Sequence, residues 1–298
     1  MSHIPVLLKE AIEALDPKKG ETVLDCTING GGHAKEIAVR IGGKGTLVGI
    51  DEDKNALFKA NQNLSGVEAE IFLEEANFRS LDKVLDKTGM ERVDKVLFDF
   101  GLSSDQLESS GRGFSFTRDE PLLMTLSTVP RLGGLTALEV VNGWSEEDLA
   151  GIIAEYGEER FALRIARGIV EARKRGIIET SGELREIISR SVPERYKHGR
   201  IHPATRTFQA IRIAVNDELG SIKEGLAKAA SRLNPGGRIA AISFHSLEDR
   251  IVKRYFRELC KENSFRQITK KPITPSNEEI TANPRSRSAK LRVIEKIP

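Results

Sequence analysis

The chain has 298 residues, 39% of them hydrophobic and 30% charged, which suits one large globular domain or one domain with an insert. No apolar run reaches the length of a membrane span, and the N-terminal segment MSHIPVLLKEAIEAL lacks the regions of a signal peptide. Cys26 and Cys260 give neither a disulfide framework nor a metal-like spacing, and the five histidines form no metal-binding motif. We therefore expect a cytoplasmic protein without a bound metal.

Charge is distributed unevenly along the chain. Residues 195–298 contain 22 Lys and Arg against 10 Asp and Glu, a net charge of +12, although the whole chain carries only +2. A basic region of this kind is typical of a surface that binds a polyanion, and a solvated surface without a partner is the alternative.

Strand-like and helix-like segments alternate over the first hundred residues. Each strand is a short apolar run followed by a helix of about ten residues, which predicts a parallel sheet with helices on both faces. The predicted strands are 22–27, 45–51, 70–73 and 94–99, and the predicted helices are 33–41, 53–64 and 78–86.

A loop rich in Gly, Ser and Pro at 101–134 interrupts this alternation, and helical periodicity follows over 136–192. Ser145 and Thr180 each begin a sequence typical of a helix capping box. The chain is therefore predicted to fold as a doubly wound α/β domain with an inserted helical domain. The predicted boundaries are 1–114 for the first part of the α/β domain, 115–203 for the insert and 204–298 for the second part.

The second part of the α/β domain continues with further helices and strands. Its predicted elements are a helix over 205–233, a turn at 234–237, a strand over 238–244, a helix capped at 246–249, and an edge hairpin of strands near 265–269 and 290–297. The stretch 272–288, rich in Pro, Ser and Asn, is predicted to be a mobile loop.

Polar residues stand where three of the predicted parallel strands end. Asn29, three glycines and His33 follow the first strand, Asp51 ends the second, and Asp99 ends the fourth. Ligands of such sheets bind beyond the carboxyl ends of the strands. Glycines let backbone N–H groups approach a ligand closely. A carboxylate some twenty residues further on suits the hydroxyl groups of a ribose.

Two nucleotide ligands fit this arrangement. NAD would place a pyrophosphate at the glycine loop, whereas S-adenosylmethionine would place an amino acid and a sulfonium cation there. Asp25 and Asp99 flank the loop. They would repel a pyrophosphate and attract a cation, so the methyl donor is favoured. An NAD-dependent oxidoreductase, or a loop that only turns the chain, is the alternative.

Seven segments spread over almost the whole length carry a more specific resemblance. They are HIPVLLKEAIEAL, DCTINGGGH, DFGLSSDQL, RGFSF, YGEER, HPATRTFQAIRIAVNDEL and NPGGRIAAISFHSLEDRIVK. In content and order they resemble the bacterial small-subunit (16S) ribosomal RNA cytosine-N4 methyltransferase family, also called the MraW family.

The resemblance implies a Rossmann-like S-adenosylmethionine-dependent methyltransferase with an inserted small all-α domain. It implies methyl transfer to the exocyclic N4 of a cytidine in the decoding region of small-subunit ribosomal RNA, with S-adenosylhomocysteine as the product. The partner would be ribosomal RNA or the small ribosomal subunit, with no membrane involved. The residues implied to line the donor site are Gly31, Gly32, His33, Asp51, Phe78, Asp99 and Gln106.

The amine of cytosine is a poor nucleophile because its lone pair is delocalised into the ring. A carboxylate that accepts a hydrogen bond from this amine would localise the lone pair and later receive a proton. Asp99 is the candidate for this role, with Ser103 or Ser104 as a neighbour. Many amino-methyltransferases have a D/S/N-P-P-Y/F/W motif here, whereas this chain has DFGL at 99–102, so the general base stays unassigned.

The target base must leave any stacked structure to react, and aromatic and basic side chains would offset that cost. The candidates for such RNA contacts are Arg112, Phe114, Phe116, Arg118 and Arg206. Phenylalanines that pin the loop to the core are an equally supported alternative. His245, which follows the fifth strand, is interpreted as a buried, hydrogen-bonded histidine.

The chain departs from the family at 119–127, where DEPLLMTLS replaces a usual D-G-P-L-D-M-R-M-D run and loses two aspartates and an arginine. Asn29 also replaces a usual glycine. The change at Asn29 is small, whereas the change at 119–127 is the basis of a second hypothesis, a catalytically weak or inactive RNA-binding or ribosome-assembly protein. The choice between naked RNA and an assembled subunit stays open, as does the oligomeric state, a homodimer included.

Overall fold

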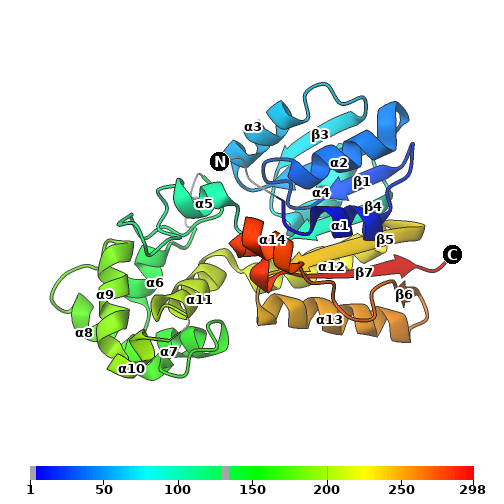
Figure 1. Cartoon of the computed structure of the whole chain (residues 1–298). Helices are drawn as coiled ribbons and strands as arrows, with labels where there is room; N and C mark the ends of the chain where they lie inside the picture. The colour runs from blue at the N-terminus through cyan, green and yellow to red at the C-terminus, as the bar shows by residue number, and fades with distance from the viewer. Residues whose placement is uncertain (1–4, 129–133, 200) are drawn as a thin grey trace. The chain divides into compact units, whose positions relative to one another are not determined.

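A computed structural model describes residues 5–128, 134–199 and 201–298 (Figure 1). The chain forms two compact units. Unit 1 comprises Met1–Ser103 and Leu219–Pro298, and unit 2 comprises Ser104–Glu218. Within the described ranges, no helix combines the length and the hydropathy that crossing a bilayer requires.

Unit 1 is built on a seven-stranded sheet of order β3-β2-β1-β4-β5-β7-β6. The strands are β1 (Thr22–Asp25), β2 (Thr46–Asp51), β3 (Glu70–Glu75), β4 (Val93–Asp99), β5 (Leu233–Ser243), β6 (Phe265–Gln267) and β7 (Lys290–Lys296). The first five pair in parallel, whereas β7 runs antiparallel to β5 and β6 antiparallel to β7. This confirms the predicted mostly parallel sheet and its antiparallel edge.

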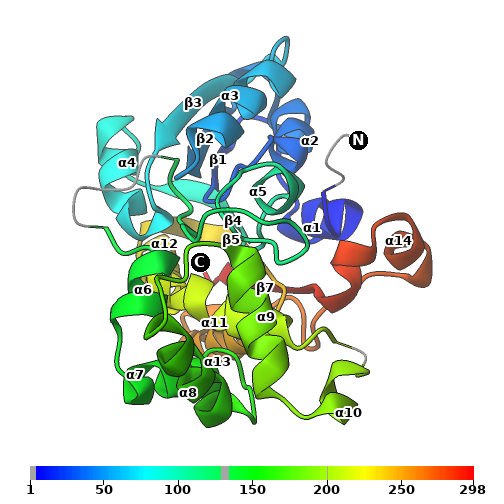
Figure 2. The same cartoon turned by 90° about the vertical axis from the view of Figure 1, so that its left-hand side faces the viewer.

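Helices cover both faces of this sheet because apolar side chains alternate along each strand (Figures 1 and 2). Val23 packs into the core under α1 (Leu8–Leu15), α2 (Gly32–Ile41) and α3 (Lys54–Asn63). Its neighbour Leu24 packs into the opposite core, under α4 (Leu81–Lys87), α12 (Glu218–Arg232) and α13 (Ser246–Lys261). The fold is therefore doubly wound, as predicted.

Unit 2 is helical. Its helices are α5 (Ser104–Glu108), α6 (Ala137–Gly143), α7 (Glu146–Glu155), α8 (Ala162–Arg173), α9 (Ser181–Ser191), α10 (Glu194–Lys197) and α11 (Ala204–Asn216). Helix α7 packs on α8 and α11, and α8 packs on α9. Thr180 forms the predicted capping box with Glu183, and Thr136 forms a second one with Glu139 that the sequence analysis did not single out.

The units divide at other positions than the predicted 114/115 and 203/204. The single helix predicted over 205–233 is two helices, because Asp217 adopts a left-handed φ of 45° and ends α11. Helix α11 packs on α6, α7 and α9, so it belongs to the helical unit.

The atypical stretch 119–127 is fixed within unit 2. The Asn216 side chain accepts a hydrogen bond from the Leu126 N–H at 2.9 Å and donates one to the Met124 carbonyl at 2.8 Å. Asp119 accepts from the Gly182 N–H at 3.0 Å, at the start of α9. This stretch is therefore held in place without the two aspartates and the arginine that it lacks relative to the family pattern.

The prediction of a mobile loop over 272–288 was wrong. Helix α14 (Asn277–Ala282) begins after Ser276, whose hydroxyl accepts from the Glu279 N–H, and the short 3₁₀ helix η3 (Pro284–Ser288) follows. The Glu279 carboxylate accepts from the Leu7 N–H at 2.7 Å and so joins α14 to the start of α1.

Candidate active site

The glycine-rich turn between β1 and α2 contains two left-handed residues, Asn29 (φ 48°) and Gly31 (φ 80°). Asparagine tolerates this conformation better than most residues, which explains how it can replace a glycine here. Gly31 precedes α2, and no side chain in the described ranges caps the N-terminus of that helix. The N–H groups of its first turn are therefore suited to an anionic group, such as the carboxylate of an amino acid.

Gly32 and Gly30 allow a matched test of how tightly this turn is packed. A Cβ on Gly32 would lie 2.2 Å from Pro5 Cγ, whereas a Cβ on Gly30 would meet nothing within 4 Å. We expect Gly32→Ala to lower the free energy of unfolding by about 1–3 kcal/mol through overpacking. Gly30→Ala should stay within about 0.5 kcal/mol of the wild type. Urea unfolding of both variants checks this, and equal midpoints would contradict it.

Asp51 organises the turn from the end of β2. Its Oδ2 accepts a hydrogen bond from the Asn29 N–H and its Oδ1 one from the Asp53 N–H, both at 2.9 Å. Asp53 in turn caps α3 through the Asn55 N–H. Burial raises the pKa of Asp51 to about 7 despite these two bonds. Each carboxylate oxygen keeps further lone pairs, so the group can also accept hydrogen bonds from a ribose diol.

Asp99 ends β4 and faces α2. Its Oδ2 lies 3.7 Å from His33 Nδ1, too far for a hydrogen bond, and its buried Oδ1 has no hydrogen-bond partner. His33 Nε2 donates to the Val6 carbonyl at 3.0 Å. Both side chains are buried, so Asp99 is a polar group with an unmet capacity for hydrogen bonding.

Three carboxyl groups with raised pKa values therefore occupy the strand ends. Burial raises the pKa of Asp25 to about 7, and burial with the nearby charges of Asp25 and Glu248 raises that of Asp99 to about 8. In the described part of the chain, no Lys or Arg forms an ion pair with Asp25, Asp51 or Asp99. A cationic ligand would supply the missing positive charge. The site thus fits the sulfonium and amino groups of S-adenosylmethionine and opposes a pyrophosphate.

Donor affinity should depend on pH for the same reason. These carboxyls are largely protonated in the empty site below pH 7, and a bound cation favours their ionised forms, so binding releases protons. We expect the affinity for S-adenosylmethionine to rise from about pH 6 to about pH 8 and then level off. S-adenosylhomocysteine lacks the sulfonium charge and should show a shallower rise. Calorimetric titrations of both ligands over this range test the assignment, which equal slopes would contradict.

Phe78 begins a 3₁₀ turn after β3 and belongs to an aromatic cluster. Its ring lies 5.7 Å from Phe98 and 5.8 Å from Phe100 between centroids. It also fills the space beside Gly225 on α12, where a Cβ would lie 2.7 Å from the ring. Half-buried on this support, Phe78 has a fixed orientation that suits a flat base.

Asn77, the residue before Phe78, is not among the predicted site residues. Its buried amide donates to Glu52 Oε1 at 2.7 Å and so links the chain after β3 to the chain after β2. The available signal was its position in the short link between the strand predicted over 70–73 and the helix predicted from 78, beside a residue already implied in donor binding.

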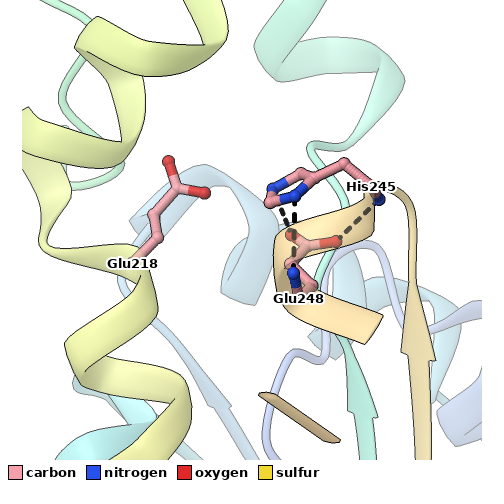
Figure 3. Close-up of side chains that lie close together, drawn as sticks. All are labelled: Glu218, His245 and Glu248. Carbon is pink, nitrogen blue, oxygen red and sulfur yellow. Dashed lines mark hydrogen bonds and ion pairs between the residues drawn. The ribbon is translucent and has the colours of Figure 1, made fainter. Parts of the chain in front are cut away.

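His245 is the N-cap of α13, not Ser246 as predicted. Its Nδ1 accepts from the Glu248 N–H, and Glu248 Oε2 accepts from the His245 N–H (Figure 3). The same Oε2 also accepts from the Phe244 N–H. His245 Nε2 lies 3.1 Å from Glu248 Oε1. The His245 ring thus stabilises the N-terminus of α13.

Two predicted site residues remain, Ser103 and Gln106. Ser103 is buried at the end of the first segment of unit 1, and Gln106 is buried on α5 of unit 2. Their roles in catalysis and donor binding stay predictions.

The predicted RNA-contacting residues divide into buried and accessible ones. Arg112 and Phe114 are buried in unit 2, where Arg112 donates to the Thr125 and Leu126 carbonyls at 2.9 and 2.6 Å. This arrangement matches the loop-pinning alternative for Phe114.

Three other candidates stay more accessible. Phe116 is half-buried and stacks on exposed His202, with ring centroids 4.5 Å apart. Arg118 is exposed, and half-buried Arg206 donates to the Glu158 carbonyl at 2.9 Å.

Comparison with known proteins shows the family of this chain. The model of the MraW methylase family matches residues 1–297. The chain belongs to this family. Its members include proteins named "Ribosomal RNA small subunit methyltransferase H". The one from Sulfurihydrogenibium sp. is 50% identical over 298 residues and covers 100% of both chains. The one from Symbiobacterium thermophilum is 47% identical over 310 residues and covers 99% of this chain and 96% of its own. The one from Clostridioides difficile is 46% identical over 310 residues and covers 99% of both chains.

Family membership confirms the predicted enzyme class and the predicted methyl donor, S-adenosylmethionine. An NAD-dependent oxidoreductase is thereby ruled out. The placement of the donor's amino-acid part at the glycine turn, of its ribose at Asp51 and of its charged end at Asp99 stays a prediction.

Proposed function

We propose that this enzyme transfers a methyl group from S-adenosylmethionine to the exocyclic N4 of a cytidine in the decoding region of small-subunit (16S) ribosomal RNA. The observation that carries the proposal is Asp99, a buried carboxyl with an unpartnered Oδ1 at the strand-end site. The names of the relatives support small-subunit ribosomal RNA as the substrate.

The bound donor supplies an electrophilic methyl group on a sulfonium cation. A positive charge nearby lowers the pKa of Asp99 from its raised value and so favours the carboxylate form. This carboxylate accepts a hydrogen bond from the cytosine amine and makes its lone pair more available to the methyl carbon. N4 gains the methyl group and loses one proton, which Asp99 receives. Alignment of donor and acceptor contributes the larger part of the rate enhancement. It is equivalent to an effective molarity on the order of 10⁵ M.

RNA contacts in unit 2 are proposed for the accessible candidates. Phe116 with His202 offers an aromatic stack, and Arg118 and Arg206 are basic residues of the same unit. Desolvation, with Arg185 nearby, lowers the pKa of His202, and its Nδ1 accepts from the Ala204 N–H. The ring is therefore neutral at pH 7, and it suits base stacking better than phosphate binding.

The test is transfer of labelled methyl groups to small ribosomal subunits that lack this modification, with naked 16S ribosomal RNA assayed in parallel. The labelled nucleoside is identified by mass. We expect label on cytosine N4. Its distribution between the two substrates decides whether the enzyme acts on RNA or on the assembled particle.

The second hypothesis, a weak or inactive RNA-binding or assembly protein, rests on the atypical 119–127 stretch. Tight donor binding without label on either substrate would favour it. Restoring the residues usual in the family would then be expected to restore transfer, whereas a normal rate in the wild type shows that the stretch is compatible with activity.

A further inference from the structure

A cleft lies on unit 1 beside α13, away from the strand-end site. It has a volume of about 240 Å³ and is bounded by α13, by β7 and by residues 267–270 at the end of β6. Helix α13 packs against β5, β6 and β7 (Figure 1). The cleft is smaller than the roughly 300–1,000 Å³ of pockets that enclose drug-sized ligands, so it suits a small group or a short stretch of a polymer.

The charge of this cleft is one-sided. Four of its nine lining residues are cationic and none is acidic. Lys253 and Arg257 lie one turn apart on α13, and Lys270 follows β6. In the described ranges these three exposed side chains form no ion pair or hydrogen bond. Unpaired cations that converge on a cleft without a carboxylate favour an anionic ligand.

The floor of the cleft is ordered and offers a hydrogen-bond donor. Arg292 on β7 is held by Asp249, which accepts from its Nε at 2.7 Å, and Phe256 is buried beneath. Thr269 Oγ1 accepts from the Val293 N–H at 2.9 Å, so its own proton remains available to a ligand. Cations around a hydroxyl donor are the groups that bind phosphate oxygens.

We propose that this cleft holds the phosphate backbone of the RNA substrate at a distance from the methylated base. The inference rests on the proposed function for the identity of the polyanion. Helix α13 begins after His245, next to the end of β5, which pairs with β4 at Asp99. At 1.5 Å per residue, Lys253 and Arg257 stand about 12 and 18 Å along the helix from His245. The cleft accounts for part of the basic character of residues 195–298.

The experiment compares two double variants with the same change in charge. Lys253→Glu with Lys270→Glu alters the cleft, and Lys44→Glu with Lys83→Glu alters two exposed lysines without an ion-pair or hydrogen-bond partner in the described ranges. Binding to naked 16S ribosomal RNA and to small subunits is measured between 50 and 200 mM salt, with donor binding and methyl transfer alongside. Thermal unfolding confirms that both variants are folded.

We expect the cleft variant to bind RNA on the order of tenfold more weakly, with a salt slope reduced by about 1.5–2. Its KM for RNA should rise while kcat and donor affinity stay unchanged, and the control variant should match the wild type. Equal RNA binding by both variants would overturn the inference while leaving the proposed function intact. So would a loss confined to whole subunits, which would indicate a ribosomal protein as the partner. Failure of the wild type to transfer methyl groups would instead refute the proposed function.

Discussion

Asp99→Ala is expected to lower methyl transfer by about 10²–10⁴-fold, the range typical for loss of a positioned acid or base. The reason is that this carboxyl combines burial, an unpartnered Oδ1 and a place at the end of β4. Asp99→Asn keeps the shape but cannot take a proton, so it should be similarly impaired. Single-turnover transfer at saturating donor measures the effect without the contribution of donor binding.

The fold should survive this change. A carboxyl whose folded pKa is raised to about 8 stabilises the folded state at low pH, and this contribution disappears as the pH rises from about 4 to about 8. Asp99→Asn removes that loss, so urea unfolding should show a variant at least as stable as the wild type at pH 8.5. Asp86→Ala, an exposed carboxylate on α4, is the matched control. Near-normal turnover by Asp99→Asn would show that Asp99 does not accept the proton in the reaction.

Asp51→Ala is expected to weaken donor binding by at least about 100-fold. The change removes the proposed acceptor for the ribose hydroxyls, and hydrogen bonds to a charged group contribute about 1.5–3 kcal/mol each. It also frees the Asn29 and Asp53 N–H groups that hold the glycine turn. Calorimetric titration with S-adenosylhomocysteine gives the affinity directly.

Glu75→Ala provides the matched control for Asp51. Glu75 ends the neighbouring strand β3, in register with Asp51, but its side chain is exposed. This variant should bind the donor like the wild type. A similar loss in both variants would mean that general negative charge, rather than contact with the ribose, explains the effect.

Much of the fold could be predicted because the strands of unit 1 are short apolar runs followed by helices. The failures have local causes. Asp217 breaks a continuous helical periodicity with a single left-handed residue, which no hydrophobic pattern reveals. Helix α14 was hidden by the Pro- and Ser-rich composition around it. A signal was nevertheless present, because Ser276 and Glu279 have the spacing by which Thr180 and Glu183 were recognised.

The site was predictable in outline and not in its electrostatics. Strand ends of a parallel sheet meet at one edge, so the grouping of Asp51, Asp99 and the glycine turn follows from their sequence positions. The raised pKa values do not follow, because they depend on burial and on the distances among Asp25, Asp99 and Glu248. The burial of Arg112 and Phe114 could not be predicted either, because residues in a loop show no periodicity from which burial can be inferred.

The insertion of unit 2 between two paired strands has a consequence for folding. Strands β4 and β5 are neighbours in the sheet, yet residues 100–232 separate them in the chain. Each doubling of the length of an unstructured loop adds about 0.6 kcal/mol to the free-energy cost of closing it. Pairing between strands that are far apart in the sequence also slows folding. If unit 2 becomes compact early, it shortens the effective loop before the two strands meet. The helical insert would then act as a folding aid, and mutations in its core would slow sheet assembly as well as destabilise the insert.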